Sequence, residues 1–233
     1  MKKMILCSIV FGLFGLFLGC VLLLAVLTQG WLPNTQVTIT TGRSSSCVST
    51  VVTTHSAPQA VVHDDITAPS VLLGRAFEVA EFLRKEDWSS LAGCVHPEKG
   101  VSFTPYSTVT EQDLNFSPIE VSAFGSDLQL YLWGYADGSG APLELTPLDY
   151  IKYYVFNTDY TQAPYLAINH VISDGNSLEN VSTAYPNSTF VEFYFPGLDE
   201  TNEGFDWCAL KLVFEPYEEH LMLVGIIHSQ WTI

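Results

Sequence analysis

The sequence predicts an α+β fold preceded by an N-terminal transmembrane helix. Three observations lead to this prediction. Residues 4–28 contain no charged residue, residues 73–83 repeat apolar side chains at helical spacing, and strand-forming segments fill the last third of the chain. Helices that precede a run of neighbouring strands are typical of the α+β class. We therefore expect N-terminal helices packed on a curved antiparallel sheet.

The apolar run is long enough to cross a bilayer. At about 1.5 Å per residue it covers the roughly 30 Å of hydrocarbon. Lys2 and Lys3 precede it and the next charge is Arg43, so the positive-inside rule predicts a cytoplasmic N-terminus and an extracellular C-terminal domain on the cell membrane. An uncleaved single-pass anchor over residues 1–29 is the favoured interpretation. A lipoprotein signal cleaved before Cys20 and a cleaved signal peptide stay open as alternatives.

Residues 30–69 differ from the anchor in composition. They are rich in Ser and Thr and have no aromatic residue after Trp31, which predicts a flexible stalk. The extracytoplasmic domain is then expected over residues 70–233. From Ser70 onward it has six basic and 23 acidic residues. Because such a charge repels nucleic acid, we expect no nucleic-acid partner.

Helix signals open the predicted domain. Leu73, Phe77, Ala80 and Leu83 recur at spacings of three and four, which predicts an amphipathic helix with these side chains buried. Gly93 is expected to stop the helical region. Further along, Thr146-Pro147-Leu148-Asp149 has a hydroxyl cap, a proline and an acid in the order that starts a helix. A short helix is also expected over residues 177–184.

Strand signals follow a period of two. The first is residues 128–137, ended by a turn at Asp137-Gly138-Ser139-Gly140. Three more segments predict an antiparallel meander: 189–195, 209–214 and 221–228. The last is apolar on both sides, so we expect it in the middle of the sheet.

Several strings resemble a family of uncharacterised exported domains of Gram-positive bacteria that end in a VGIIHxQWTI-like strand. These strings are WSSLAGCVHPEKGVSFTPY, YPNSTFVEFYFPG, GFDWCALKLVFE and LVGIIHSQWTI, and the resemblance covers Ala76 to Ile233. The family's topology is in turn similar to the cone-shaped, cystatin-like fold of nuclear transport factor 2 and ketosteroid isomerase. The resemblance implies an internal pocket but no activity.

In enzymes of that fold, catalysis uses polar side chains that project into the cone. The candidates here are His96, Glu98 and His228, because a histidine beside a carboxylate can act as a general base. Both histidines also have a structural interpretation, in which they bond to backbone groups. No nucleophile or phosphate-binding motif is present, and no cofactor is expected.

Binding residues are candidates of a second kind. Aromatic side chains that could line a ligand surface, with one neighbouring amide, are Tyr106, Trp133, Trp207, Gln230 and Trp231. Burial in the core is the alternative for each aromatic residue.

Metal and disulfide candidates complete the set. The acidic loop offers Asp199, Glu203 and Asp206, but the EF-hand pattern fails because its twelfth place is Leu210, so no metal is expected. Cys94 and Cys208 are the two cysteines of the domain, and they either pair in an oxidising exterior or stay as buried thiols. The resembled family has no cysteine at these positions, which favours their pairing here.

The resulting functional hypothesis is a non-catalytic domain that binds a small ligand or an envelope protein at the cell surface. A small hydrolase or isomerase with a histidine–carboxylate site inside the cone is one alternative. A structural module of an envelope complex is another. The sequence leaves the ligand and the oligomeric state open.

Overall fold

The structure is a computed structural model that describes residue 66 and residues 68–173, 175 and 177–231. The predicted anchor and nearly all of the predicted stalk lie outside these residues. Within the described part of the chain, no helix is both long and apolar enough to span a bilayer. The described residues belong to one compact unit, residues 60–233.

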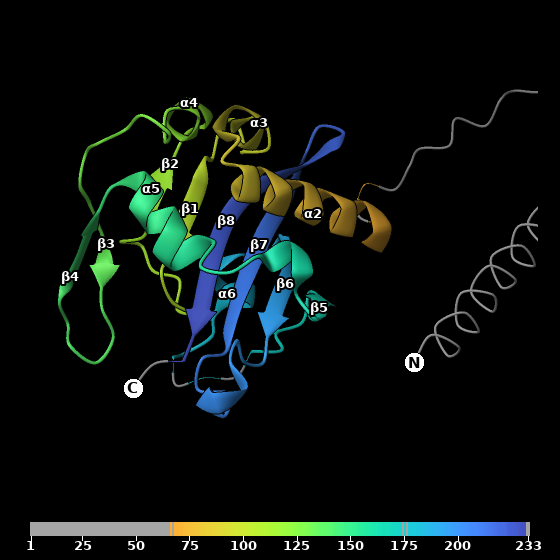
Figure 1. Cartoon of the computed structure of the whole chain (residues 1–233). Helices are drawn as coiled ribbons and strands as arrows, with labels where there is room; N and C mark the ends of the chain where they lie inside the picture. The colour runs from red at the N-terminus through yellow and green to blue at the C-terminus, as the bar shows by residue number, and fades with distance from the viewer. Residues whose placement is uncertain (1–65, 67, 174, 176, 232–233) are drawn as a thin grey trace, which may run out of the picture. The chain divides into compact units, whose positions relative to one another are not determined.

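A six-stranded sheet forms the centre of this unit (Figure 1). In sheet order its strands are β2 (Leu114–Phe116), β1 (Val101–Thr104), β8 (His220–Gln230), β7 (Cys208–Tyr217), β6 (Thr189–Phe195) and β5 (Tyr165–Ile168). The meander β6-β7-β8 is antiparallel as predicted, and β8 lies in the middle of the sheet as predicted. The prediction of a purely antiparallel sheet was wrong, because β1 pairs with β8 in parallel.

Two helical segments, α2 and the later α5 (Pro147–Tyr150), cover one face of the sheet (Figure 1). Helix α2 spans Pro69–Lys85 and is followed by α3, Trp88–Ala92, which Asp87 caps by accepting from the Ser90 amide. The buried stripe of α2 differs by about one position from the prediction: Leu73 and Phe77 are only partly buried, and the buried residues are Leu72, Ala76, Val79, Ala80 and Leu83. Gly93 ends α3 as predicted.

The predicted helix start at Thr146 is confirmed. The Thr146 hydroxyl accepts a hydrogen bond from the Asp149 amide, and α5 (Pro147–Tyr150) continues directly into a π-helical turn, η1 (Ile151–Val155). π-Helical turns are rare in proteins, and those that do occur often lie at functional sites. The predicted helix over 177–184 shortens to α6 (Val181–Ala184), which lies behind the sheet (Figure 1).

The predicted strand 128–137 becomes β3 (Tyr131–Tyr135) and pairs only with β4 (Pro142–Leu145) in a separate hairpin. The turn between them is the predicted one, with positive φ at Gly138 and Gly140. The shorter elements are α4 (Pro118–Ser122), η2 (Tyr160–Gln162) and η3 (Glu200–Asn202). The result is an α+β fold with a mixed, curved sheet.

Candidate functional site

A groove with a volume of about 570 Å³ lies between the loop after β1 and the β3–β4 hairpin. We call it the aromatic groove. Its described lining residues are Pro105, Tyr106, Thr108, Thr110, Gln112, Asp113, Trp133, Gly134, Tyr135, Ala136, Asp137, Gly138, Gly140 and Ser177. Ligand sites of this size usually combine aromatic walls with a few placed polar groups, and this groove has both.

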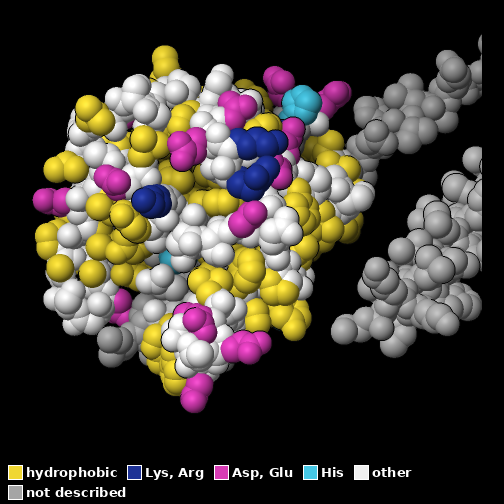
Figure 2. Space-filling view, in the orientation of Figure 1, with side chains coloured by type: hydrophobic (Ala, Val, Ile, Leu, Met, Phe, Trp, Pro, Cys, Tyr) yellow, Lys and Arg dark blue, Asp and Glu magenta, His cyan; other side chains and the backbone are white. Residues whose placement is uncertain are grey.

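The charge around the aromatic groove is negative. Residues 100–151 include seven acidic residues and no Lys, Arg or His. Asp113 and Asp137 are the acidic members of the lining. Figure 2 shows the wider pattern, with acidic side chains spread over the visible face and basic ones confined to a few positions. A negatively charged ligand is therefore disfavoured here.

Hydrogen bonds fix the loop side of the groove. Asp113 accepts from the buried Thr104 hydroxyl, from the Thr110 hydroxyl at 2.8 Å and from the Thr110 amide at 3.2 Å. Since Thr104 lies at the end of β1, these bonds tie the loop to the central sheet. The groove wall is held in place before any ligand arrives.

The hairpin side of the groove depends on a close approach to the loop. The Asp137 amide donates to the Tyr106 hydroxyl at 3.2 Å. Gly134 has a φ of +145°, and a Cβ there would lie 3.2 Å from Pro105 Cγ. A glycine is therefore required where the two walls meet.

Stacked aromatic rings lie behind the inner wall of the groove, to which Trp133 belongs. Trp133 stacks on Tyr150 with ring centroids 3.7 Å apart and an interplanar angle of 6°. Tyr154 of η1 follows at 5.6 Å from Tyr150 and 6.2 Å from Tyr106. Burial raises the pKa of Tyr150 well above its usual value, and its hydroxyl has no hydrogen-bond partner among the described residues. Sequence reasoning missed Tyr150 and Tyr154, although both follow the helix start that it identified.

His228 lies under the helices and is fully buried. Its Nδ1 is 3.4 Å from the Pro105 carbonyl oxygen, and its ring is 6.4 Å from that of Tyr154. Burial is the main cause that lowers the pKa of His228 to about 4, so the ring is neutral at neutral pH. The Nδ1–H tautomer that donates to Pro105 leaves Nε2 as an acceptor, and this atom has no partner in the described structure.

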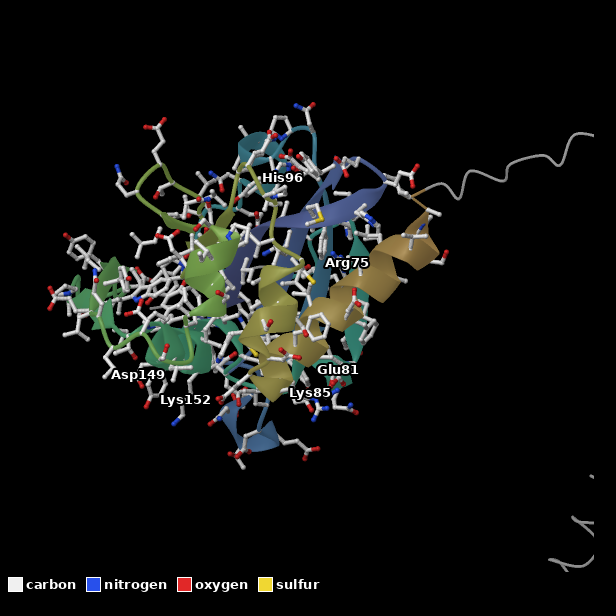
Figure 3. The ribbon with its side chains drawn as sticks, turned by 90° about the horizontal axis from the view of Figure 1, so that it is seen from above. Arg75, Glu81, Lys85, His96, Asp149 and Lys152 are labelled. Carbon is white, nitrogen blue, oxygen red and sulfur yellow. The ribbon has the colours of Figure 1, made fainter. Side chains whose placement is uncertain are left out.

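His96 shapes a turn and lies away from the groove. Its Nδ1 accepts from the amides of Glu98 and Lys99 at 3.2 and 3.1 Å, and its ring packs edge-on against Tyr217 at 4.8 Å. Glu98 instead accepts from the Tyr217 hydroxyl at 3.4 Å. Figure 3 shows His96 on the other side of the molecule from Asp149 and Lys152. Across the described ranges, neither His96 nor His228 forms an ion pair or hydrogen bond with a carboxylate.

The five predicted ligand-binding residues separate into three places. Tyr106 and Trp133 line the aromatic groove. Gln230 lines a smaller hollow of about 330 Å³ beside Tyr154 and β4. Trp207 is buried against Gly175 and Tyr194, and Trp231 packs on Phe205 at the far end of β8.

The acidic loop uses its carboxylates for its own hydrogen bonds. Asp206 accepts from the Asp199 amide at 2.8 Å and from Asn202 at 2.9 Å, while Asp199 caps η3 through Thr201. Glu203 ends that turn with a positive φ. No cluster of three metal-ligating side chains, in this loop or elsewhere, occurs among the residues that the structure describes.

Cys94 and Cys208 are free and buried, so the disulfide is not formed in the structure. Cys94 bonds through its carbonyl to Leu223 of β8, whereas Cys208 pairs with Gln230 of the same strand. Leu223 and Gln230 are seven residues apart along β8, which corresponds to roughly 23 Å. The two cysteines beside them are therefore too far apart for a disulfide. Burial raises the pKa of the Cys94 thiol to about 11.

Sequence reasoning also missed a buried ionic cluster on the opposite face of the sheet. Lys211 and Glu192 are cross-strand partners on β7 and β6, and both side chains are fully buried. Lys211 Nζ lies 2.7 Å from Glu179 Oε2, 3.0 Å from Ser229 Oγ and 3.3 Å from Glu192 Oε1. The signal was a single charged residue in each of the two predicted strand segments 189–195 and 209–214.

Glu192 connects this cluster to the segment that covers it. Its carboxylate accepts from the Ile172 amide and from the amide and hydroxyl of Ser173. Glu179 and Asn180 continue the connection, the latter through two hydrogen bonds to the Val109 backbone at 2.8 and 2.9 Å. The cluster therefore fastens Ile172, Ser173, Glu179 and Asn180 to the sheet and to the loop of the groove.

No family model and no curated protein matches this chain. Two solved structures are similar to it in fold. A protein titled as a variant of Rd1NTF2 has 10% identity and covers 70% of this chain and 96% of its own, with a TM-score of 0.30. A Xanthomonas campestris protein described as a calcium/calmodulin dependent protein kinase II association domain has 9% identity, covers 70% and 87%, and has the same TM-score of 0.30. Likeness at this level contributes nothing to the function inferred below.

Proposed function

We propose that the domain is a non-catalytic binding module that takes an uncharged or positively charged, hydroxyl-bearing ligand in the aromatic groove. One observation carries this proposal. The groove places the tyrosine rings of Tyr106 and Tyr135 beside carboxylate, hydroxyl and amide side chains, with no basic residue among its described lining. Aromatic faces bind apolar ring surfaces, and the carboxylates accept hydrogen bonds from hydroxyl or amine groups.

Two buried polar atoms behind the groove lack a partner in the described structure. Tyr150 Oη and His228 Nε2 are buried without a partner in the described structure, and their rings join the aromatic wall through Tyr154. Unpaired buried polar atoms cost free energy, so each one in a folded protein requires an explanation. Neither residue belongs to the described lining of the groove, so a buried water molecule, and not the ligand, would have to recover part of that cost.

The enzymatic alternative has less support. A general base of the kind expected requires a histidine within hydrogen-bond reach of a carboxylate or substrate proton. His96 is engaged by two backbone amides, and His228 is directed at a backbone carbonyl. Tight burial of His228 also removes it from solvent.

The setting of the domain follows from the sequence. An anchor over residues 1–29 and a stalk over residues 30–69 would hold the domain at the outer surface of the cell membrane. The resemblance to exported Gram-positive domains with a cone-shaped fold agrees with this setting. A hydroxyl-rich polymer of the envelope is then a ligand within reach of the stalk.

Calorimetric titration of the full-length protein, in a detergent without a sugar headgroup, tests the proposal. The probes are tetramers of N-acetylglucosamine, of glucosamine and of galacturonate, which are neutral, cationic and anionic. We expect the neutral and cationic probes to bind and the anionic probe to bind at least roughly tenfold more weakly.

Two exposed tyrosines provide a matched pair of variants. Tyr135 lines the groove and is 60% exposed, whereas Tyr165 lies on β5 and is 54% exposed. Tyr135→Ala should weaken binding by at least roughly tenfold, because a stacking surface is lost, and Tyr165→Ala should leave it unchanged. Preferred binding of the anionic tetramer, or full binding by Tyr135→Ala, would contradict the proposal.

A further inference from the structure

The outer side of the β3–β4 hairpin carries apolar side chains where water would favour polar ones. Leu128, Leu130 and Leu132 alternate along the approach to β3 and along the strand, and their exposed fractions are 83%, 62% and 43%. We call these three residues the leucine row. An antiparallel pair with one face in water normally alternates apolar and polar residues, so the row is a departure from the expected pattern.

Folding of the hairpin does not use the leucine row. Trp133 and Leu143 are the buried residues of its inner side, and Trp133 also donates from Nε1 to the Leu145 carbonyl at 2.9 Å. Tyr131 packs inward at 5.3 Å from Phe116 of β2. Contacts of the inner side therefore attach the hairpin to the rest of the domain. The stability of the fold does not explain why leucines occupy the outer side.

Acidic side chains border the leucine row. Asp127 precedes it in the chain, and Glu144 stands directly opposite Leu132 in the β3–β4 ladder. Residues 100–151, which include the whole hairpin, have no basic residue. Figure 2 shows hydrophobic side chains gathered on the side where Figure 1 places β3 and β4, with acidic side chains among them.

We propose that the leucine row is a docking surface for a segment of another protein in which apolar side chains alternate with Lys or Arg. The leucines supply apolar area, and the acidic border selects the charge of the partner. The row extends over about 13 Å, which matches about five residues of extended chain. A second copy of this acidic domain and an anionic lipid surface would both be repelled by the same border.

This surface is separate from the aromatic groove. None of the three leucines belongs to the lining of the groove. Loss of one binding activity should leave the other in place, so a failure of this inference and a failure of the proposed ligand function can be distinguished.

Fluorescence anisotropy of the full-length protein with labelled peptides tests the inference. The probes are peptides of about seven residues that alternate Leu with Lys, Ser with Lys, or Leu with Glu. We expect the Leu/Lys peptide to bind, the equally charged Ser/Lys peptide to bind at least roughly tenfold more weakly, and the Leu/Glu peptide not to bind. Equal affinity for the Leu/Lys and Ser/Lys peptides would overturn the inference, because charge alone would explain it.

Variants locate the binding to the row. The double substitution Leu130→Ser/Leu132→Ser should weaken the Leu/Lys peptide at least roughly tenfold. The matched control is Leu178→Ser/Leu198→Ser, which removes two leucines that are 72% and 48% exposed elsewhere, and it should bind like the wild type. Equal loss in both variants would overturn the inference. The inference would also be overturned if the wild type self-associated, or adsorbed to phosphatidylglycerol vesicles, and the Leu130→Ser/Leu132→Ser variant did not.

Discussion

The two faces of the six-stranded sheet both bury apolar side chains, but they differ in the polar groups buried with them. Under α2 and α5, the core consists of aromatic and aliphatic side chains, and two polar atoms, His228 Nε2 and Tyr150 Oη, are buried there without a partner among the described residues. On the opposite face, a smaller apolar cluster of Val181, Phe190, Val213, Val224 and Ile227 is joined by the buried Lys211–Glu192 pair, which is bonded to the serine and backbone groups around it.

The difference indicates where each face can change. A core held by apolar area tolerates a lost polar contact, because most of its stabilisation comes from surface removed from water. A buried ion pair is stable only when all its members are present, because each charge loses its hydration. The helix-covered face is therefore the one on which a binding groove can vary, and the opposite face is the one that holds the groove loop in place.

Removal of Lys211 should have the largest effect. Lys211→Met leaves Glu192 buried without its cation, and we expect the free energy of unfolding to fall by about 3–5 kcal/mol. The double variant Lys211→Met/Glu192→Leu should recover part of that loss, because only Glu179, whose side chain is 26% exposed, then keeps a charge in the cluster. Urea denaturation followed by circular dichroism measures both. The control is Lys99→Met, which breaks the exposed pair with Glu215 and should cost about 0–1 kcal/mol.

The next effect concerns pH and the helix-covered face. The folded pKa of His228 is about 4, below the ordinary value of 6.5, so the unfolded chain binds the proton more readily in this interval. Stability from this group is complete above pH 6.5 and is lost as the pH falls toward 4. Between pH 7 and pH 5 the wild type should lose about 2 kcal/mol that His228→Gln does not lose.

A control for this pH effect lies on the same strand. His220 is exposed on β8, and His220→Gln should keep the pH dependence of the wild type. A parallel loss of stability in wild type and His228→Gln would show that other groups cause the acid sensitivity.

The smallest effect separates two buried tyrosines. The Tyr150 hydroxyl has no partner among the described residues, so Tyr150→Phe should raise stability by about 1 kcal/mol. The Tyr160 hydroxyl donates to Asn157 at 2.9 Å, so Tyr160→Phe should lower stability by about 1 kcal/mol. Thermal unfolding of both variants measures the contrast. The same sign for both would mean that a solvent molecule or another group satisfies Tyr150.

Local patterns predicted the elements better than they predicted the site. Capping at Thr146, the glycine turn at 137–140 and the three last strands follow from neighbouring residues, and the structure has them. The parallel pairing of β1 with β8 escaped prediction because β1 has only four residues and its partner lies over a hundred residues away. Tertiary contact decides such a short strand.

The candidate site was only partly predictable. Tyr106 and Trp133 were singled out, but the groove arises because a loop and a hairpin meet at Gly134, which no spacing in the sequence reveals. His96 and His228 were grouped by residue type, and the structure separates them. The Glu192–Lys211 pair could have been found, since each residue is the single charge in one of two consecutive predicted strands, 189–195 and 209–214.

The most direct test of the account is a map of where a ligand binds. Nuclear magnetic resonance spectra of the ¹⁵N-labelled chain, titrated with the N-acetylglucosamine tetramer, should show shifted amide signals in residues 106–113 and 133–140. The amides of Ile172 and Ser173, which bond to Glu192 on the opposite face, should stay unchanged. Shifts confined to that face, or no shifts at all, would contradict the assignment of the aromatic groove as the binding site.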